Sequence, residues 1–202
     1  VAEDISKDIN QDSIDAVFDF NNGNFKISDD RIGITVKKSE LINLLVDNMY
    51  ELEDIAIPVE ITEPKVTKKL LSRINGVIGE FSTSFKGSAY GRTQNIKVSS
   101  TTMSNLLIMP GQEISYNNTL GPVQGKHGYM EAPVIINGEL TPGMGGGVCQ
   151  SSTTLYNALL LADVTIVERH PHSIAAAYVP KGTDGAVASG YLDLRFRNDY
   201  DF

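Results

Sequence analysis

The segment of residues 143–162 constrains the fold more than any other part of the sequence, because it joins a run of glycines to a helical pattern. Its first part, GMGGGVCQSST, contains Cys149, the one cysteine of the chain. Apolar residues then recur at helical spacing: Leu155, Ala158, Leu159 and Ala162. The hydroxyl residues of the segment 151–153 are typical of a helix start. The sequence therefore predicts an amphipathic helix, with Cys149 at or just before its first turn.

Residues 1–66 carry the patterns of a small unit that contains both helix and strand. Apolar residues flank Asn22-Gly23, which predicts a β-hairpin. The run SELINLLVDNMYEL predicts a helix that is capped by Ser39. Its expected core face consists of Leu41, Leu44, Leu45, Met49 and Leu52. Val59 and Ile61 alternate with polar residues between Pro58 and Pro64, which predicts an edge strand.

Residues 67–202 repeat this mixture on a larger scale. A strand is expected in INGVIGEFSTSF, and a helix with a small-residue face is expected in RTQNIKVSSTTMSNLLIM, ending near Pro110. APVIINGEL predicts a hairpin around Asn137-Gly138, and VTIVERHPHS predicts a strand. If this strand continues beyond Pro171, alternate residues share one face: Ile166, Glu168, His170 and His172. The run GYLDLRFRN alternates: Leu192, Leu194 and Phe196 on one side, and Tyr191, Asp193, Arg195 and Arg197 on the other. The fold class is therefore α+β, with domains at 1–66 and 67–202 and a hinge near Lys65, Lys68 and Lys69.

Charge and hydropathy exclude some classes of function. The net charge of −8 argues against a nucleic-acid partner, because binding to phosphates requires a basic surface. No run approaches the roughly 20 apolar residues that span a bilayer. The polar, acidic start VAEDISKDINQDSIDA does not resemble a signal peptide, so we expect an export signal or membrane anchor to lie upstream of this sequence.

The position of Cys149 favours a reactive thiol. A helix N-terminus offers unpaired N–H groups and the positive end of the helix dipole, and both favour a thiolate. The backbone N–H groups of Gly145, Gly146, Gly147 and Gln150 are candidates for an oxyanion hole. The alternative is a small buried side chain without chemistry, which is common for a free cysteine.

A cysteine nucleophile also needs a base, and the chain has three histidines. We favour His170 and then His172, which follow the cysteine helix in RHPHS, with Glu168 or Asp193 as the group that orients the imidazole. The alternatives are two surface histidines, or a zinc site made by both with Cys149 or His127. Because this spacing differs from the usual paired zinc motifs, we expect neither a metal nor another cofactor.

Five segments in this order resemble the VanW domain, which is named from accessory proteins of vancomycin-resistance clusters in Gram-positive bacteria. They are NIKVSSTTMSNLLIMPGQEISYN, KHGYMEAPVIINGEL, GGGVCQSSTTLYNALL, VERHPHS and GYLDLRFRN. The resemblance covers about residues 75–199, and the segment around the cysteine is highly specific. Residues 12–70 more loosely resemble a peptidoglycan-binding domain that often precedes VanW domains.

The resemblance implies a cell-wall protein on the extracellular face of the envelope, either exported or anchored in the membrane. Some members of the family are linked to L,D-transpeptidation, in which the motif cysteine forms a thioester with a peptidoglycan stem peptide and an amine of a neighbouring stem resolves it. The candidate substrate-binding residues are His127, Tyr129, Ser151, Arg169 and Arg195. Of these, Arg169 or Arg195 is expected to bind a stem carboxylate, because the guanidinium fork of arginine matches a carboxylate. A hydrolase that cuts the same bond and a non-catalytic wall-binding or scaffold protein remain alternatives.

Overall fold

The computed structural model describes residues 1–21, 24–50, 54–136 and 138–202, which divide into two compact units, Val1–Asn75 and Gly76–Phe202. Both units contain helices and strands, so the predicted α+β class is confirmed. The boundary between the compact units lies nine residues beyond the domain boundary expected from the sequence. Within the described residues, no helix combines the length and apolarity needed to cross a bilayer.

The first unit contains three helices and two hairpin-like pairs of strands among the described residues. In chain order they are α1 (Ala2–Ile9), β1 (Phe18–Asn21), β2 (Asn24–Ile27), β3 (Gly33–Val36), α2 (Lys38–Asp47), β4 (Val59–Thr62) and α3 (Lys68–Leu71). β1 pairs antiparallel with β2, and β3 with β4, as the hairpin and edge-strand patterns predicted. The turn residues Asn22-Gly23 lie outside the described residues.

Two expectations for the first unit need correction. The helix α2 ends at Asp47, so Met49 lies in a turn and is exposed instead of facing a core, while Leu41 is buried as predicted. Leu52 lies outside the described residues. The predicted lysine-rich hinge is tied to this unit, because the Lys68 ammonium lies 2.6 Å from an Asp29 carboxylate oxygen and its backbone N–H donates to Asp30.

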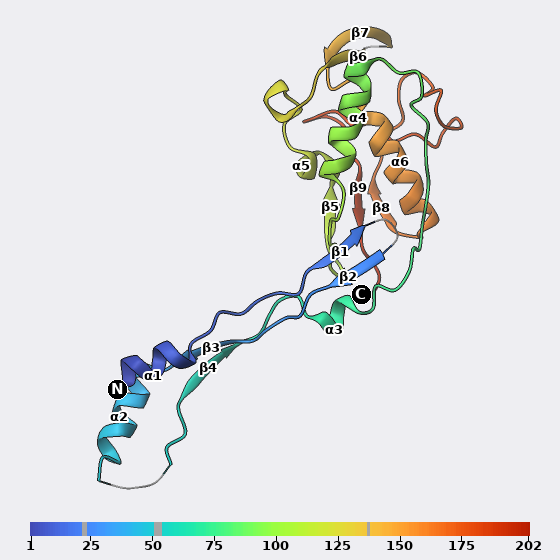
Figure 1. Cartoon of the computed structure of the whole chain (residues 1–202). Coiled ribbons are helices and arrows are strands. Elements are labelled where there is room, and N and C mark those ends of the chain that lie inside the picture. The colour runs from blue at the N-terminus through green and yellow to red at the C-terminus, as the bar shows by residue number, and fades with distance from the viewer. Residues whose placement is uncertain (22–23, 51–53, 137) are drawn as a thin grey trace. The chain divides into compact units, whose positions relative to one another are not determined.

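The second unit is built around two helices and a short three-stranded sheet (Figure 1). Its elements are α4 (Tyr90–Thr102), β5 (Glu113–Ser115), α5 (Tyr116–Leu120), the 3₁₀ turn η1 (Gly125–His127), β6 (Glu131–Ile136), β7 (Glu139–Met144), α6 (Val148–Leu161), β8 (Thr165–Glu168) and β9 (Arg195–Arg197). β9 lies between β5 and β8 and is antiparallel to both. β6 and β7 form the predicted hairpin, whose residue Asn137 lies outside the described residues.

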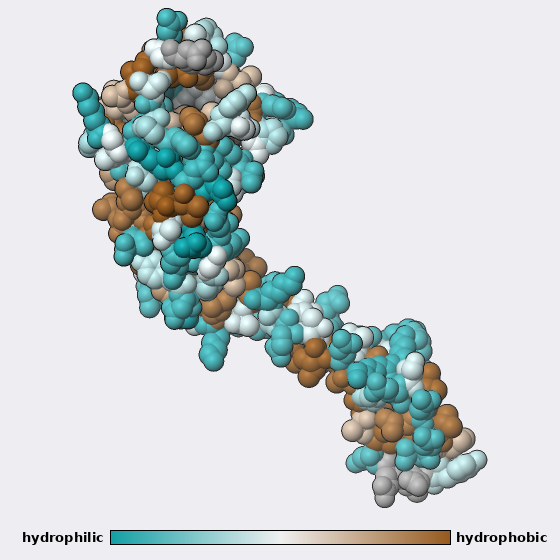
Figure 2. Space-filling model, turned by 180° about the vertical axis from the view of Figure 1, so that it is seen from behind, coloured by the Kyte–Doolittle hydropathy of each residue, from teal (hydrophilic) through white to brown (hydrophobic). Residues whose placement is uncertain are grey.

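The core of this unit lies between the sheet and the two long helices. It contains Ile114, Tyr116, Leu120, Tyr129, Val148, Val187, Leu194 and Phe196. The predicted alternation is confirmed for residues 194–197, since Leu194 and Phe196 are buried while Arg195 and Arg197 are exposed. It does not extend to Leu192 and Asp193, which precede β9 and are both half-buried. Outside the core, hydrophobic side chains form small patches between hydrophilic ones on the face drawn in Figure 2.

The helix α4 packs against α6 through small side chains, as its sequence predicted. Asn95 and Ser99 are fully buried, and the Ser99 hydroxyl bonds to the Ser151 hydroxyl of α6. The predicted extent was too long, because α4 ends at Thr102, well before Pro110.

The prediction of a strand in residues 74–85 was wrong. Residues 76–85 lie outside any helix or strand, and side chains hold part of this segment on α6. The Thr83 hydroxyl lies 2.8 Å from that of Thr154, and the Gln150 amide donates to Thr83.

Candidate active site

The glycines before α6 are required by close packing and by backbone conformation. Gly145 and Gly147 have φ angles of 82° and 110°, in the region that favours glycine. A β-carbon on Gly146 would lie 2.4 Å from the Pro133 carbonyl oxygen and 2.6 Å from that of Ala132. The helix begins at Val148, so Cys149 lies in its first turn, as the sequence predicted.

Cys149 is partly exposed at the helix start. Its thiol donates a hydrogen bond to the Val187 carbonyl oxygen, at 3.4 Å. Val187 belongs to the segment 184–187, which follows a long loop after His172. This segment therefore lies directly beside the sulfur.

His172 is the histidine that interacts with Cys149. Its side chain is only 8% exposed, and its Nδ1 lies 2.6 Å from an oxygen of the Asp184 carboxylate. Hydrogen bonding with the Cys149 side chain is the main cause that raises the pKa of His172 above its usual value; burial opposes this, and Asp184 reinforces it. The imidazole is thus bonded to a carboxylate and also interacts with the Cys149 thiol.

Asp184 is buried and its carboxylate is fixed by several donors. The oxygen that meets Nδ1 of His172 also accepts the backbone N–H of His172 at 2.6 Å. Burial alone would raise the pKa of Asp184, but the hydrogen bonds from the backbone and side chain of His172 outweigh it, and the pKa lies below its usual value. The residues Cys149, His172 and Asp184 thus form a row of thiol, imidazole and carboxylate, which is the set of groups that cysteine nucleophiles use.

Polar residues of α6 hold the segment that carries this acid. The Ser152 hydroxyl donates to the Gly185 carbonyl oxygen at 2.6 Å, and the Gly185 N–H donates to the Thr153 hydroxyl at 2.9 Å. One turn later, the Asn157 amide donates to the Thr183 carbonyl oxygen at 2.7 Å. Because the same helix carries Cys149, these bonds fix the segment of Asp184 relative to the Cys149 thiol.

The other histidine of RHPHS points elsewhere. Nε2 of His170 lies 2.9 Å from a carboxylate oxygen of Glu168, and its backbone pairs with Ala186. The strand ladder is irregular between Ile166 and Glu168, and Pro171 follows His170, so the expected common face of the strand does not continue to His172. Neither Glu168 nor Asp193 orients the imidazole that meets the sulfur.

Arg169 supports the acid. Its Nε donates to the Asp184 carbonyl oxygen at 2.6 Å, and its Nη2 lies 3.2 Å from the Asp184 carboxylate and 2.8 Å from the Gly182 carbonyl oxygen. The guanidinium also lies over the Tyr156 ring of α6, 5.3 Å from the centroid. The Arg169 guanidinium, which was expected to bind a substrate carboxylate, is therefore largely engaged within the protein.

Two of the four expected oxyanion donors are already used within the protein. The N–H of Gly145 donates to the Met130 carbonyl oxygen and that of Gln150 to the Gly147 carbonyl oxygen. In the part of the chain that the structure describes, no hydrogen bond engages the N–H of Gly146, Gly147 or Cys149. The first turn of α6 therefore retains donors beside the sulfur.

The remaining expected site residues lie away from the sulfur or inside the fold. Ser151 is buried, and its hydroxyl bonds within the core to Tyr116 and Ser99. Tyr129 is buried in the same core, whereas His127 is exposed and bonds to the Pro122 carbonyl oxygen. Arg195 forms ion pairs with Glu113 and Glu168.

Two residues beside Cys149 were missed by the sequence reasoning. Asp184 lies in a loop, in KGTDGAVAS, where no periodic pattern marks it. Tyr178 lies in the same loop, with its ring 6.0 Å from the Arg92 guanidinium. Burial raises the pKa of Tyr178 to about 12, so its hydroxyl remains protonated at neutral pH. The order of residues in the sequence gives no sign that this loop returns to α6.

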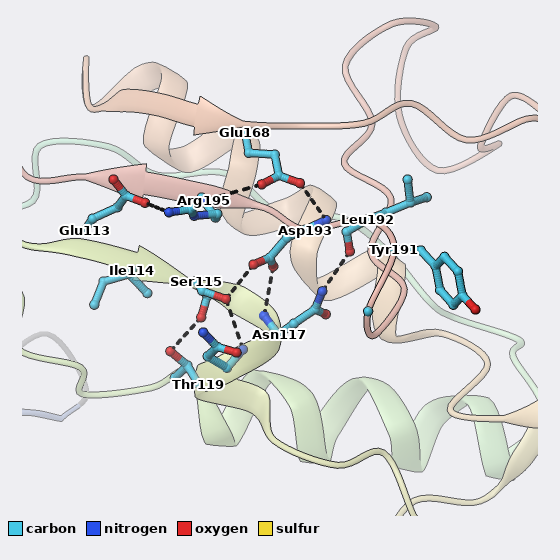
Figure 3. Close-up of a pocket in the computed structure, with 12 residues that line it drawn as sticks. Glu113, Ile114, Ser115, Asn117, Thr119, Glu168, Tyr191, Leu192, Asp193 and Arg195 are labelled. Atoms are coloured by element: carbon cyan, nitrogen blue, oxygen red, sulfur yellow. Dashed lines mark hydrogen bonds and ion pairs between the residues drawn. The ribbon is translucent and has the colours of Figure 1, made fainter.

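A pocket of about 930 Å³ lies on the outer face of the sheet (Figure 3). It is lined by residues of β5, α5, β8 and the segment 190–195, and Cys149 is not among them. Among the described residues, no three His, Cys, Asp or Glu side chains are grouped so as to hold a metal ion.

Comparisons with known proteins agree with the motif. Residues 91–202 match the family model described as "VanW like protein", and residues 2–55 match the model described as "Putative peptidoglycan binding domain". The chain is 38% identical to the uncharacterized protein YoaR of Bacillus subtilis over 73% of this chain and 49% of YoaR. It is 33% identical to the vancomycin B-type resistance protein VanW of Enterococcus faecalis over 53% of this chain and 41% of that protein. The chain thus spans half or less of the length of these relatives, and no solved structure matches it.

Proposed function

Since this chain belongs to the VanW-like family, we propose that it is a cell-wall protein whose second unit is a cysteine-dependent L,D-transpeptidase on the outer side of the envelope. The peptidoglycan-binding match of the first unit supports peptidoglycan as its partner. The single observation that carries the enzymatic proposal is the row formed by Cys149, His172 and Asp184.

The first half of the proposed reaction forms a thioester. The Cys149 sulfur attacks the carbonyl carbon between the third residue of a stem tetrapeptide and its terminal D-alanine, and His172 takes the thiol proton. The carbonyl oxygen becomes an oxyanion beside the N–H groups at the start of α6, including that of Cys149. The C–N bond then breaks, His172 gives its proton to the leaving amine, and D-alanine departs.

The second half transfers the acyl group to an amine. The amine on the third residue of a neighbouring stem attacks the thioester carbonyl, and His172 removes a proton from it. The C–S bond breaks, the thiolate is protonated by His172, and a 3-3 cross-link remains. Asp184 stays ionised throughout and stabilises the imidazolium, which its lowered pKa favours.

The test is the incubation of purified protein with disaccharide-tetrapeptides, followed by mass spectrometry. We expect 3-3 dimers and free D-alanine from the wild type, and neither from Cys149→Ala. Tripeptide monomers without dimers identify a hydrolase. Equal dimer yields from both proteins would exclude Cys149 as the nucleophile, and binding without any product would leave a non-catalytic wall-binding protein.

A further inference from the structure

The pocket of Figure 3 lies on the polar face of the sheet β5-β9-β8. Residues of this sheet alternate, so Ile114 and Phe196 are buried in the core while the side chains of Ser115 and Arg195, which pair across the strands, lie on the opposite face. Ser115, Arg195 and the buried Ile114 are all among the residues that line the pocket. A volume of about 930 Å³ is large enough for a ligand of several rings or residues. The proposed thiol chemistry uses no residue of this pocket.

The charged groups that line the pocket are fixed by one another. The Arg195 guanidinium bonds to the Glu113 carboxylate and lies 3.7 Å from that of Glu168. The Asp193 carboxylate accepts the Ser115 hydroxyl and the backbone N–H of Asn117, the latter at 3.0 Å. The pocket thus holds three carboxylates and one guanidinium, and this excess of negative charge disfavours an anionic ligand. Because the carboxylates are hydrogen-bonded, their oxygens are acceptors in fixed positions.

The other lining groups favour an uncharged, hydroxyl-rich ligand. Asn118 is exposed and offers a side-chain amide with both donors and an acceptor. Tyr191 is 88% exposed and follows Gly190, whose φ angle is 80°. Its backbone N–H donates a hydrogen bond to the Ala188 carbonyl oxygen, which fixes the position of the residue. Figure 3 shows its ring at one end of the pocket, apart from the bonded cluster, so an apolar ring face is available for stacking.

We propose that this pocket binds an uncharged glycan built of N-acetylated amino sugars. Sugar hydroxyls donate to carboxylate oxygens and accept from the remaining N–H groups of Arg195. Acetamido groups match the amide of Asn118, and the C–H face of a sugar ring covers the Tyr191 ring. The site would hold a glycan strand on the second unit, separately from the thiol.

The test is calorimetric titration of the whole chain, carrying Cys149→Ala, with a tetramer of N-acetylglucosamine. This probe has no peptide and the variant has no thiol, so the result does not depend on the proposed transpeptidation. We expect saturable binding that Tyr191→Ala weakens about tenfold, because one stacked ring is lost. Tyr90→Ala is the matched control, since Tyr90 is 74% exposed in the same unit and is not part of this pocket; its binding should equal that of the parent.

Localisation comes from amide chemical shifts in the labelled chain, which should move at Gly190 and Leu192. Absence of binding, equal affinity for Tyr191→Ala and its parent, or shifts confined to the first unit would each overturn the proposal. A tetramer of glucosamine tests the charge argument. Tighter binding of this cationic probe, abolished by salt, would identify an electrostatic cation site instead of a glycan site.

Discussion

The imidazole and backbone of His172 are joined to the same carboxylate oxygen of Asp184, each at 2.6 Å. Because Nδ1 is bound to Asp184, Nε2 is the ring nitrogen left for the Cys149 side chain, whose hydrogen bonding raises the pKa of His172. These two hydrogen bonds to one oxygen fix the position of the ring and engage Nδ1. This relationship separates the two histidines of RHPHS, which are two residues apart in the sequence.

Replacement of each histidine tests this separation. We expect His172→Ala to lower kcat for the proposed cross-link formation by about 10²- to 10⁴-fold, because the proposed base is lost. It should also slow alkylation of Cys149 by iodoacetamide at pH 7. His170→Ala is the matched control, since His170 bonds to Glu168, and it should retain most of both rates. Comparable losses in the two variants would contradict the assignment of His172 as the base.

The sequence predicted that these histidines share a face, and the reason it failed is local. Alternation assumes a regular strand, but the ladder is irregular between Ile166 and Glu168, and β8 ends at Glu168. Beyond Pro171 the chain turns toward Asp184. By contrast, the helix after Cys149 was predictable, because its apolar period is long and uninterrupted.

Asp184→Asn probes the acid through the pH dependence of stability. The pKa of Asp184 is lowered by folding, so its carboxylate stabilises the fold above about pH 3.9, and this contribution is lost as the pH falls through the lowered pKa. The pKa of His172 is raised, so the contribution of its charged form is complete below about pH 6.5 and is lost as the pH rises through the raised pKa.

The variant should therefore be destabilised most between about pH 4 and 6.5, with a smaller difference on both sides. Urea unfolding at a series of pH values measures this difference. We also expect kcat to fall by at least about tenfold, because the imidazolium loses its partner. A difference in the free energy of unfolding that is the same at every pH would contradict the charge pairing.

The acid itself was not predictable, because nothing in the sequence ties a loop aspartate to α6. The loop and α6 are joined by polar side chains of α6. From the sequence, these side chains were interpreted only as part of the start and the body of a helix. Ser152 and Thr153 bond to Gly185, and Asn157 bonds to Thr183. The motif thus encodes a long-range arrangement that periodicity cannot express.

Gly146→Ala tests the packing of the glycine segment. The added β-carbon would lie 2.4 Å from the backbone oxygen of Pro133, so the start of α6 or the hairpin β6–β7 must move. We expect destabilisation by about 1–3 kcal/mol and loss of activity, because the first turn carries Cys149. Gly125→Ala, where no atom lies within 4 Å of an added β-carbon, is the control. Thermal unfolding of both variants decides; wild-type stability of Gly146→Ala would refute the packing argument.

Arg169→Met decides between two roles for this arginine. The sequence suggested a fork for a substrate carboxylate, whereas the structure joins Arg169 to the backbone and carboxylate of Asp184 and to Gly182. If it positions the acid, the variant should lower kcat with little change in KM, and unpaired acceptors should lower the free energy of unfolding by about 1–3 kcal/mol. Arg197→Met is the control, because it removes only an exposed ion pair with Asp199. It should change neither kcat nor the free energy of unfolding. A raised KM with unchanged kcat would instead support direct binding of a substrate carboxylate.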